Sequence, residues 1–186
     1  PYTTLFRSKR VISSQLRSLE PDLVVISAHH AAWSTNFHEF SKGPQEMNFD
    51  RYFTALETTL RDLKNELHSS DILLLGQLPL WHPSIPTIFN ARYALTFFGY
   101  EFDASDFADQ EVFNIDQRLE TIAEHLMIQI IKPLDVFCYI ARCSGLTRNG
   151  MASTHDYGHL SSAGSINFAE YFYEFLFESE RSVLSN

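Results

Sequence analysis

The sequence contains no apolar run long enough to span a bilayer. Its longest runs, such as "DILLLGQLPL" at residues 71–80, are short and interrupted by polar residues. The first residues also lack the basic-then-apolar pattern of a signal peptide. We therefore expect the chain itself to be soluble. Because it begins at Pro1 and residues 1–20 show no clear relation to the pattern that follows, we expect a fragment of a longer protein, with a poorly defined first segment that is partly foreign to the fold.

Clusters of basic residues are absent as well. The chain has 14 Lys and Arg against 23 Asp and Glu, a formal net charge of −9, and no run of Lys or Arg. Nucleic acids and anionic membrane surfaces are recognised by basic patches, so neither is an expected partner. With 45% hydrophobic residues the chain can bury one sizeable core. We predict a single domain over residues 21–180.

Cysteine is scarce, and nothing predicts a metal site. Cys138 and Cys143 are the only cysteines, and their spacing fits either a small disulfide in an oxidising compartment or two unrelated buried thiols. Two sulfur ligands are too few for a structural zinc site. His29 and His30 are adjacent at a strand end, where neighbouring side chains point to opposite faces, so they do not bind one ion together. We expect no metal and no cofactor.

What the sequence does contain is an alternation of short apolar runs with longer helical patterns. Apolar residues recur at helical spacing in some segments, while others are short Val, Ile and Leu runs typical of buried strands. The expected strands are residues 21–28, 71–79 and 133–140, and the expected helices are residues 49–70, 114–132 and 161–179. This order predicts a three-layer α/β/α fold with a parallel sheet, in which ligands bind beyond the carboxyl ends of the strands.

Chemistry-bearing residues gather in "THDYGHLSSAG", residues 154–164, between the third expected strand and the last expected helix. Asp156 precedes His159 by three residues, so the carboxylate can orient one ring nitrogen while the other faces a nucleophile. This is the base and orienting half of a Ser-His-Asp system. Alternatively, Asp156 caps the loop and His159 packs at the helix start. The spacing alone leaves both readings open.

The same block resembles a known family. Asp156, His159 and the Leu-Ser and Ala-Gly that follow are similar to the last motif of the SGNH hydrolases, in the form D-x-x-H-L-S-x-x-G. That form occurs in the SGNH domain fused behind bacterial membrane-embedded acyltransferase-3 proteins, which O-acetylate surface polysaccharides. Three more segments resemble that domain in the same order: "PDLVVISAHHAAW", "ILLLGQLPLWHPSIP" and "PLDVFCYIARCSG". The resemblance covers about Pro21 to Phe177 and implies an SGNH hydrolase, flavodoxin-like fold.

The resemblance implies that His159 is the general base and that Asp156 orients it. The family's nucleophile is a Ser in a Gly-Asp-Ser block on the first strand, upstream of the segment that resembles "PDLVV". No "GDS" occurs in the 186 residues. We therefore expect the first strand and its nucleophile to lie outside this chain; the alternative is a domain that has lost catalysis.

The expected substrate contacts also depart from the wider family. Where the Gly-x-Asn-Asp block would supply an oxyanion donor, the sequence reads "SAHHAAWSTN", and Trp33 fits the acyltransferase-fused subgroup better. We expect Trp33, His30 and Trp81 to contact substrate. Trp81 could form a wall against a sugar ring or could simply cover the sheet edge. Because the related domains face the periplasm and often carry cysteine here, the resemblance also implies a Cys138–Cys143 disulfide that staples the loop before Asp156.

Together these observations predict the periplasmic SGNH domain of a bacterial inner-membrane acyltransferase that O-acylates, in particular O-acetylates, cell-envelope polysaccharide. Its expected partners are an acyl donor, a carbohydrate acceptor and the membrane acyltransferase domain of the same full-length chain. Two alternatives remain at this stage. One is a stand-alone SGNH carbohydrate esterase, and the other is a catalytically inactive domain that binds carbohydrate or serves as a scaffold.

Overall fold

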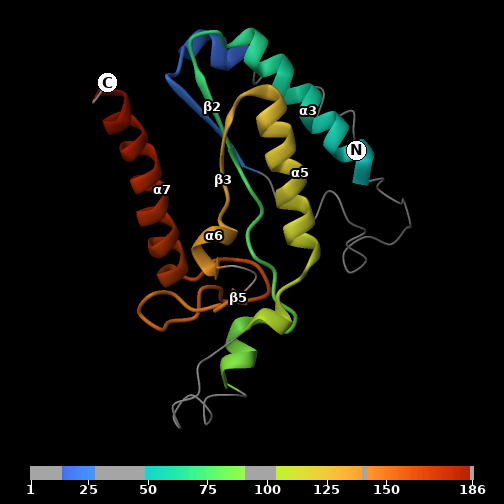
Figure 1. The fold of residues 1–186 in the computed structure, drawn as a ribbon, viewed down its shortest axis with the longest axis vertical. Coiled ribbons are helices and arrows are strands. Elements are labelled where there is room, and N and C mark those ends of the chain that lie inside the picture. Colours follow the sequence, from blue (N-terminus) through green and yellow to red (C-terminus); the bar gives the residue numbers. More distant parts are fainter. Residues whose placement is uncertain (1–13, 28–48, 91–103, 140–141, 185–186) are drawn as a thin grey trace. The chain divides into compact units, whose positions relative to one another are not determined.

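The computed structural model describes residues 14–27, 49–90, 104–139 and 142–184 (Figure 1). The chain forms two compact units. We call them the sheet unit, which comprises Pro1–Gly76 and Ile115–Ile130, and the loop unit, which comprises Gln77–Asn114 and Ile131–Asn186. The domain boundaries expected from the sequence, at residues 20 and 180, stay predictions.

The sheet unit is built on three strands in the order β1-β2-β3. These are β1 (Leu23–Ile26), β2 (Asp71–Leu75) and β3 (Gln129–Ile131), with β2 in the middle (Figure 1). β1 and β2 are parallel, and Leu23 lies opposite Asp71. Three consecutive residues of β2 are buried, which is typical of a strand that is covered on both faces. They are Ile72, Leu73 and Leu74.

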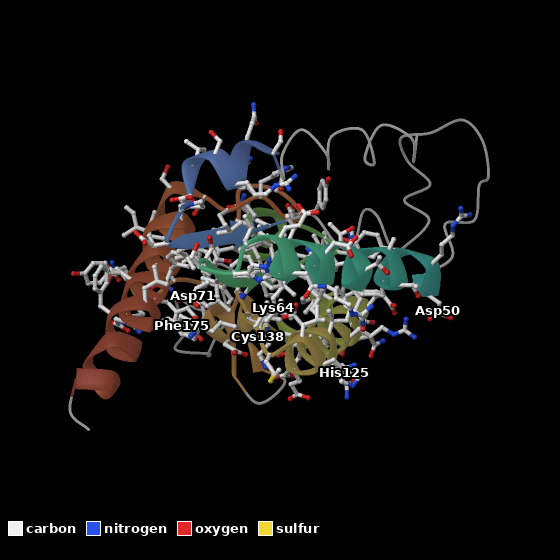
Figure 2. All side chains as sticks on the ribbon, turned by 90° about the horizontal axis from the view of Figure 1, so that it is seen from above. Asp50, Lys64, Asp71, His125, Cys138 and Phe175 are labelled. Atoms are coloured by element: carbon white, nitrogen blue, oxygen red, sulfur yellow. A yellow bond between two sulfur atoms is a disulfide. The ribbon has the colours of Figure 1, made fainter. Side chains whose placement is uncertain are left out.

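Helix α3 (Phe49–Glu66) forms because its apolar residues recur on one stripe and its end charges favour the helix dipole. Asp50 lies in the first turn and Lys64 in the last, and Figure 2 shows them toward opposite ends of the helix. The buried residues of the stripe, extended past the helix end, are Phe53, Leu60, Leu63 and Leu67. Burial of that stripe places α3 in the core of the sheet unit.

Helix α5 (Glu111–Leu126) has a defined start and stop. At the start, an Asp109 carboxylate oxygen accepts a hydrogen bond from the backbone N–H of Glu111 at 2.9 Å. At the end, the Lys64 ammonium donates to the carbonyl oxygens of Leu126 and Met127, which are left without helical partners. Met127 adopts a positive φ of 49°, which turns the chain out of the helix.

The structure corrects the position of the third strand. The sequence predicts a helix to residue 132 and a strand at 133–140, whereas β3 is Gln129–Ile131 and residues 134–137 form a short helix, α6 (Leu134–Phe137). The left-handed turn at Met127 ends α5 early and leaves the next residues extended. The α/β class and the parallel pairing are nevertheless confirmed.

The loop unit has less regular structure. Its helical parts are residues 85–90, the 3₁₀ turn η1 (Ser105–Phe107), α6 and α7 (Ser162–Leu184). Its strands are β4 (Cys138–Tyr139) and β5 (Arg142–Cys143), which form an antiparallel hairpin. Its buried cluster consists of Trp81, Ile85, Ile88, Ala104, Ala108 and Cys143. Within the described parts of the chain, no helix has the length and apolar character needed to cross a membrane.

Candidate active site

The site lies in the loop between β5 and α7, within the loop unit (Figure 1). Thr154 and Leu160 form an isolated antiparallel bridge across this loop. Inside that bridge, the backbone N–H of His155 donates to the carbonyl oxygen of His159 at 3.0 Å. The chain therefore turns back on itself between residues 155 and 159. This places the two histidines opposite each other, with Asp156 in the turn.

The base of the loop is fixed by Ser153, which is fully buried. Its backbone N–H and its hydroxyl both donate to the carbonyl oxygen of Gly145, at 2.9 and 2.7 Å. Its own carbonyl accepts from the N–H of Ser161 at 2.9 Å. Ser161 then caps α7, because its hydroxyl accepts from the N–H of Gly164 at 3.0 Å. A Cβ at Gly164 would lie 1.9 Å from the Ser153 carbonyl oxygen, so this helix start approaches the loop as closely as only glycine allows.

Asp156 and His159 contact each other directly. One carboxylate oxygen of Asp156, Oδ1, accepts hydrogen bonds from the backbone N–H groups of Gly158, at 2.9 Å, and His159, at 2.8 Å. The other, Oδ2, lies 2.7 Å from Nδ1 of the His159 ring. Since a carboxylate only accepts, Nδ1–H is the donor, and Nε2 of a neutral ring then carries the lone pair. This arrangement orients an imidazole for proton abstraction at Nε2.

The environment of Asp156 keeps its carboxylate charged. Burial by itself raises the pKa, but hydrogen bonds from the Gly158 and His159 amides, the hydrogen bond from the His159 ring and the attraction to that ring outweigh it. Together they lower the pKa from 3.8 to about 2. Asp156 is therefore an anion throughout the pH range in which a histidine base operates.

Further rings surround this pair, and the sequence reasoning did not select them. The His155 ring stacks on that of His159 with centroids 5.7 Å apart. Tyr157 meets His159 edge-on at 5.9 Å, and His82 stacks on Tyr157 at 6.4 Å. The signal available was that His155 and Tyr157 flank Asp156 in the same short motif.

Trp81 lies close to the loop in a different way from that expected. Its backbone N–H donates to the Tyr157 carbonyl oxygen at 2.7 Å, so the backbone at Trp81 helps to hold the site loop in place. Its side chain is 0% exposed and belongs to the buried cluster, so the ring does not form an accessible wall for a sugar. The structure therefore contradicts the expected substrate contact: Trp81 is a core residue of the loop unit. His30 and Trp33 lie outside the described residues, and their substrate contacts stay predictions.

The two cysteines form a disulfide, with an S–S distance of 2.10 Å. Cys138 and Cys143 are direct partners across the β4–β5 hairpin. Gly145, two residues after the bond, is the acceptor that holds Ser153 at the base of the site loop. The covalent link thus lies one short connection away from the loop.

The same loop contains a group of side chains able to ligate a metal. His155, Asp156 and His159 offer ligand atoms that all lie within 4.8 Å of one another. The sequence analysis considered the two cysteines and the His29–His30 pair for such a role and missed this group.

Comparisons with known proteins agree with this architecture. A family model described as "SGNH domain (fused to AT3 domains)" matches residues 4–174. The structure is also similar to that of the Salmonella ser. Paratyphi A lipopolysaccharide acetyltransferase periplasmic domain, with a TM-score of 0.64 and 18% sequence identity. That match covers 88% of this chain and 60% of the Salmonella chain. No curated protein matches the chain.

At 18% identity the structural likeness shows the fold, while the family model covers most of the sequence, including the Asp156 to Gly164 block. Parallel sheet, helical connections and the Asp-His loop before the last helix occur here in one chain. The chain therefore belongs to the family of SGNH domains fused to AT3 domains.

Proposed function

We propose that this chain is the periplasmic SGNH domain of a bacterial acyltransferase that O-acylates cell-envelope polysaccharide, with His159 as general base and Asp156 as its orienting partner. The observation that carries the proposal is the 2.7 Å contact between Asp156 Oδ2 and His159 Nδ1 on an exposed loop. The membership of a family fused to membrane acyltransferases supports it, as does the likeness to an acetyltransferase periplasmic domain.

The proposed reaction has two transfers. A serine hydroxyl from a Gly-Asp-Ser block outside these 186 residues attacks the carbonyl carbon of the acyl donor, and His159 Nε2 takes its proton. The donor's leaving group departs with that proton, which leaves an acyl-serine ester. A sugar hydroxyl then gives its proton to Nε2 and attacks the ester carbonyl. The acyl group passes to the sugar, and Nε2 returns the proton to the departing serine oxygen, which regenerates both the serine hydroxyl and the neutral histidine. Asp156 stabilises the imidazolium at each stage.

Water in place of the sugar would make the same groups an esterase. The Asp156–His159 pair would activate either acceptor, and the family's fusion to membrane acyltransferases favours the sugar. A non-catalytic domain is the outcome if the gene product supplies no serine in reach of His159.

The test is acyl transfer by the gene product that includes a Gly-Asp-Ser block, with ester formation on the polysaccharide and release of free acid measured separately. His159→Ala should lower transfer by about 10²- to 10⁴-fold, the range for loss of general-base catalysis. Replacing the block's Ser removes the nucleophile and should abolish transfer. His125→Ala, an exposed histidine on α5 (Figure 2), is the matched control and should keep full activity.

Two results would contradict the assigned roles. Transfer that survives both substitutions would remove His159 from the reaction. Turnover of a small activated acetyl ester by the 186-residue chain alone, abolished by His159→Ala, would show that the nucleophile lies within these residues.

A further inference from the structure

We propose that His155, Asp156 and His159 form a binding site for a divalent zinc ion, and that the bound ion switches off the base. The proposal starts from three potential ligands in one tight turn. Their ligand atoms all lie within 4.8 Å of one another. Binding of the ion depends only on this geometry; the consequence for catalysis rests on the proposed function.

Two of the three ligand separations are close to those that a tetrahedral ion needs. Ligands about 2.0–2.1 Å from a tetrahedral zinc lie roughly 3.3–3.4 Å apart. Asp156 Oδ2 is 3.7 Å from His155 Nε2 and 2.7 Å from His159 Nδ1. One separation closes slightly and the other opens by well under 1 Å as the ion replaces the shared proton. The third pair, the two histidine nitrogens, lies within 4.8 Å. Both imidazoles are exposed, so their rotation would bring the three ligand atoms to the separations that the ion requires.

The outer contacts of two of the three ligands, His155 and Asp156, already suit metal binding. His155 Nδ1 lies 3.2 Å from the carbonyl oxygen of Leu160, and a hydrogen bond donated there leaves the lone pair on Nε2, the nitrogen nearer to Asp156. Asp156 is held through Oδ1 by the amides of Gly158 and His159, which leaves Oδ2 to coordinate. Metal-binding histidines and carboxylates in proteins are oriented by contacts of this kind.

The site is accessible, and its ligand types select the metal class. The side chains of His155, Asp156 and His159 are 63%, 36% and 61% exposed. Three protein ligands leave the fourth tetrahedral position to water. Two imidazoles with one carboxylate suit zinc and its transition-metal neighbours, whereas Mg²⁺ and Ca²⁺ prefer all-oxygen sites.

Occupancy by zinc and action as a base are mutually exclusive for His159. A neutral imidazole has one ring proton, which lies on Nδ1 when Asp156 accepts it. An ion bound through Nδ1 requires that proton to sit on Nε2 instead. Nε2 then has no lone pair to take a proton from serine or sugar. Zinc would therefore inhibit acyl transfer reversibly and without any change of fold.

The experiment is calorimetric titration of the 186-residue chain with ZnCl₂. We expect one zinc ion to bind. Its affinity should fall at least about tenfold in each of the single variants His155→Gln and His159→Gln, since loss of even an outer contact to a metal ligand costs about 10- to 100-fold. His125→Gln and His68→Gln, both exposed histidines elsewhere, are controls that should bind as the wild type does. Titration with MgCl₂ should give no binding at this loop.

The results of the titration and of the acyl-transfer assay test the metal site and its inhibitory role separately. Zinc affinity unchanged in both His155→Gln and His159→Gln would overturn the site. In the acyl-transfer assay, zinc should inhibit the wild type and EDTA should restore it; full activity at saturating zinc would overturn the inhibitory role while the calorimetry upholds the site. If no acyl transfer is found under any condition, the proposed function fails, and the titration still decides the metal site by itself.

Discussion

Different kinds of interaction stabilise the sheet unit and the site region of the loop unit. In the sheet unit, stability comes from apolar side chains repeated along α3, β2 and α5, most of them fully buried. In the loop unit, the conformation of the loop around Asp156 is set by single hydrogen bonds, one disulfide and a glycine that has no room for a side chain. In the sheet unit the buried surface is shared among many side chains, whereas the geometry of the site depends on individual atoms.

The largest loss of stability should come from the sheet unit. Leu60 on α3 is 0% exposed, and Leu60→Ala should lower the free energy of unfolding by about 2–5 kcal/mol, through lost burial and the cavity left behind. Urea denaturation measures this change. Thr58→Ala, an exposed position on the same helix, should change stability by no more than about 0.5 kcal/mol.

The same variant also tests whether the geometry of the site depends on the core of the sheet unit. Under native conditions, the NMR signals of the His159 ring in Leu60→Ala should match those of the wild type, because its contact with Asp156 is made within the loop unit. A His159 ring that changes its signals in Leu60→Ala would show that the site geometry depends on the core of the sheet unit.

Next in size is a substitution aimed at the loop itself. In Gly164→Ala, the new Cβ would meet the Ser153 carbonyl oxygen at 1.9 Å, so the backbone must move. The expected cost is about 1–3 kcal/mol, as for other overpacked sites, with altered NMR signals of the His159 ring. Gly150→Ala is the comparison, because its Cβ meets nothing within 4 Å and only its φ of 72° is unfavourable.

Gly150→Ala should leave the His159 signals unchanged. If Gly164→Ala also left them unchanged and cost no more than Gly150→Ala, the close approach of α7 would not be what positions the site.

The contrast between the units also explains what the sequence could predict. Apolar spacing predicts α3 and β2 because burial on one stripe or in one strand is a repeated signal. It fails after Leu126, where the helix stops through a hydrogen bond from Lys64, 62 residues earlier in the chain, and a left-handed turn at Met127. Periodicity carries no information on such a contact between distant residues.

At the site, the motif drew attention to Asp156 and His159, but their contact depends on the turn that closes the loop. The part played by His155 follows from the same turn, because only the fold brings it over His159. The sequence also predicted a substrate contact for Trp81 that the structure does not support. Its position after a strand suggested an exposed ring, whereas its burial is decided in part by Ala104, Ala108 and Cys143, which lie well beyond it in the sequence.

A smaller effect is expected from the disulfide. Replacing Cys138 and Cys143 together by Ser should lower the free energy of unfolding by about 2 kcal/mol or less, because the bond closes only a short loop. Thermal unfolding with and without reductant measures it. Reductant should lower the melting temperature of the wild type and leave that of the double variant unchanged; equal stability of the two proteins without reductant would mean that the hairpin is held by its backbone alone.

The smallest effect should come from the charge on Asp156, and it should depend on pH. The Asp156→Asn variant keeps an oxygen to accept from the Gly158 and His159 amides and loses only the charge facing the His159 ring. The pKa of Asp156 is about 2 in the folded chain against 3.8 in the absence of these contacts, so ionisation stabilises the folded state above pH 3.8. That contribution is lost as the pH falls from 3.8 through about 2.

Melting temperatures of wild type and Asp156→Asn, measured from about pH 6 down to about pH 2 at low salt, should therefore differ at the upper end and converge at the lower. Asp106→Asn, at an exposed position in η1, is the control for removal of one surface charge. Because Asp156 is about one-third exposed, water screens its interactions and the difference should be small. A difference that stays constant over the whole range would mean that the turn, and not the charge, accounts for what Asp156 contributes.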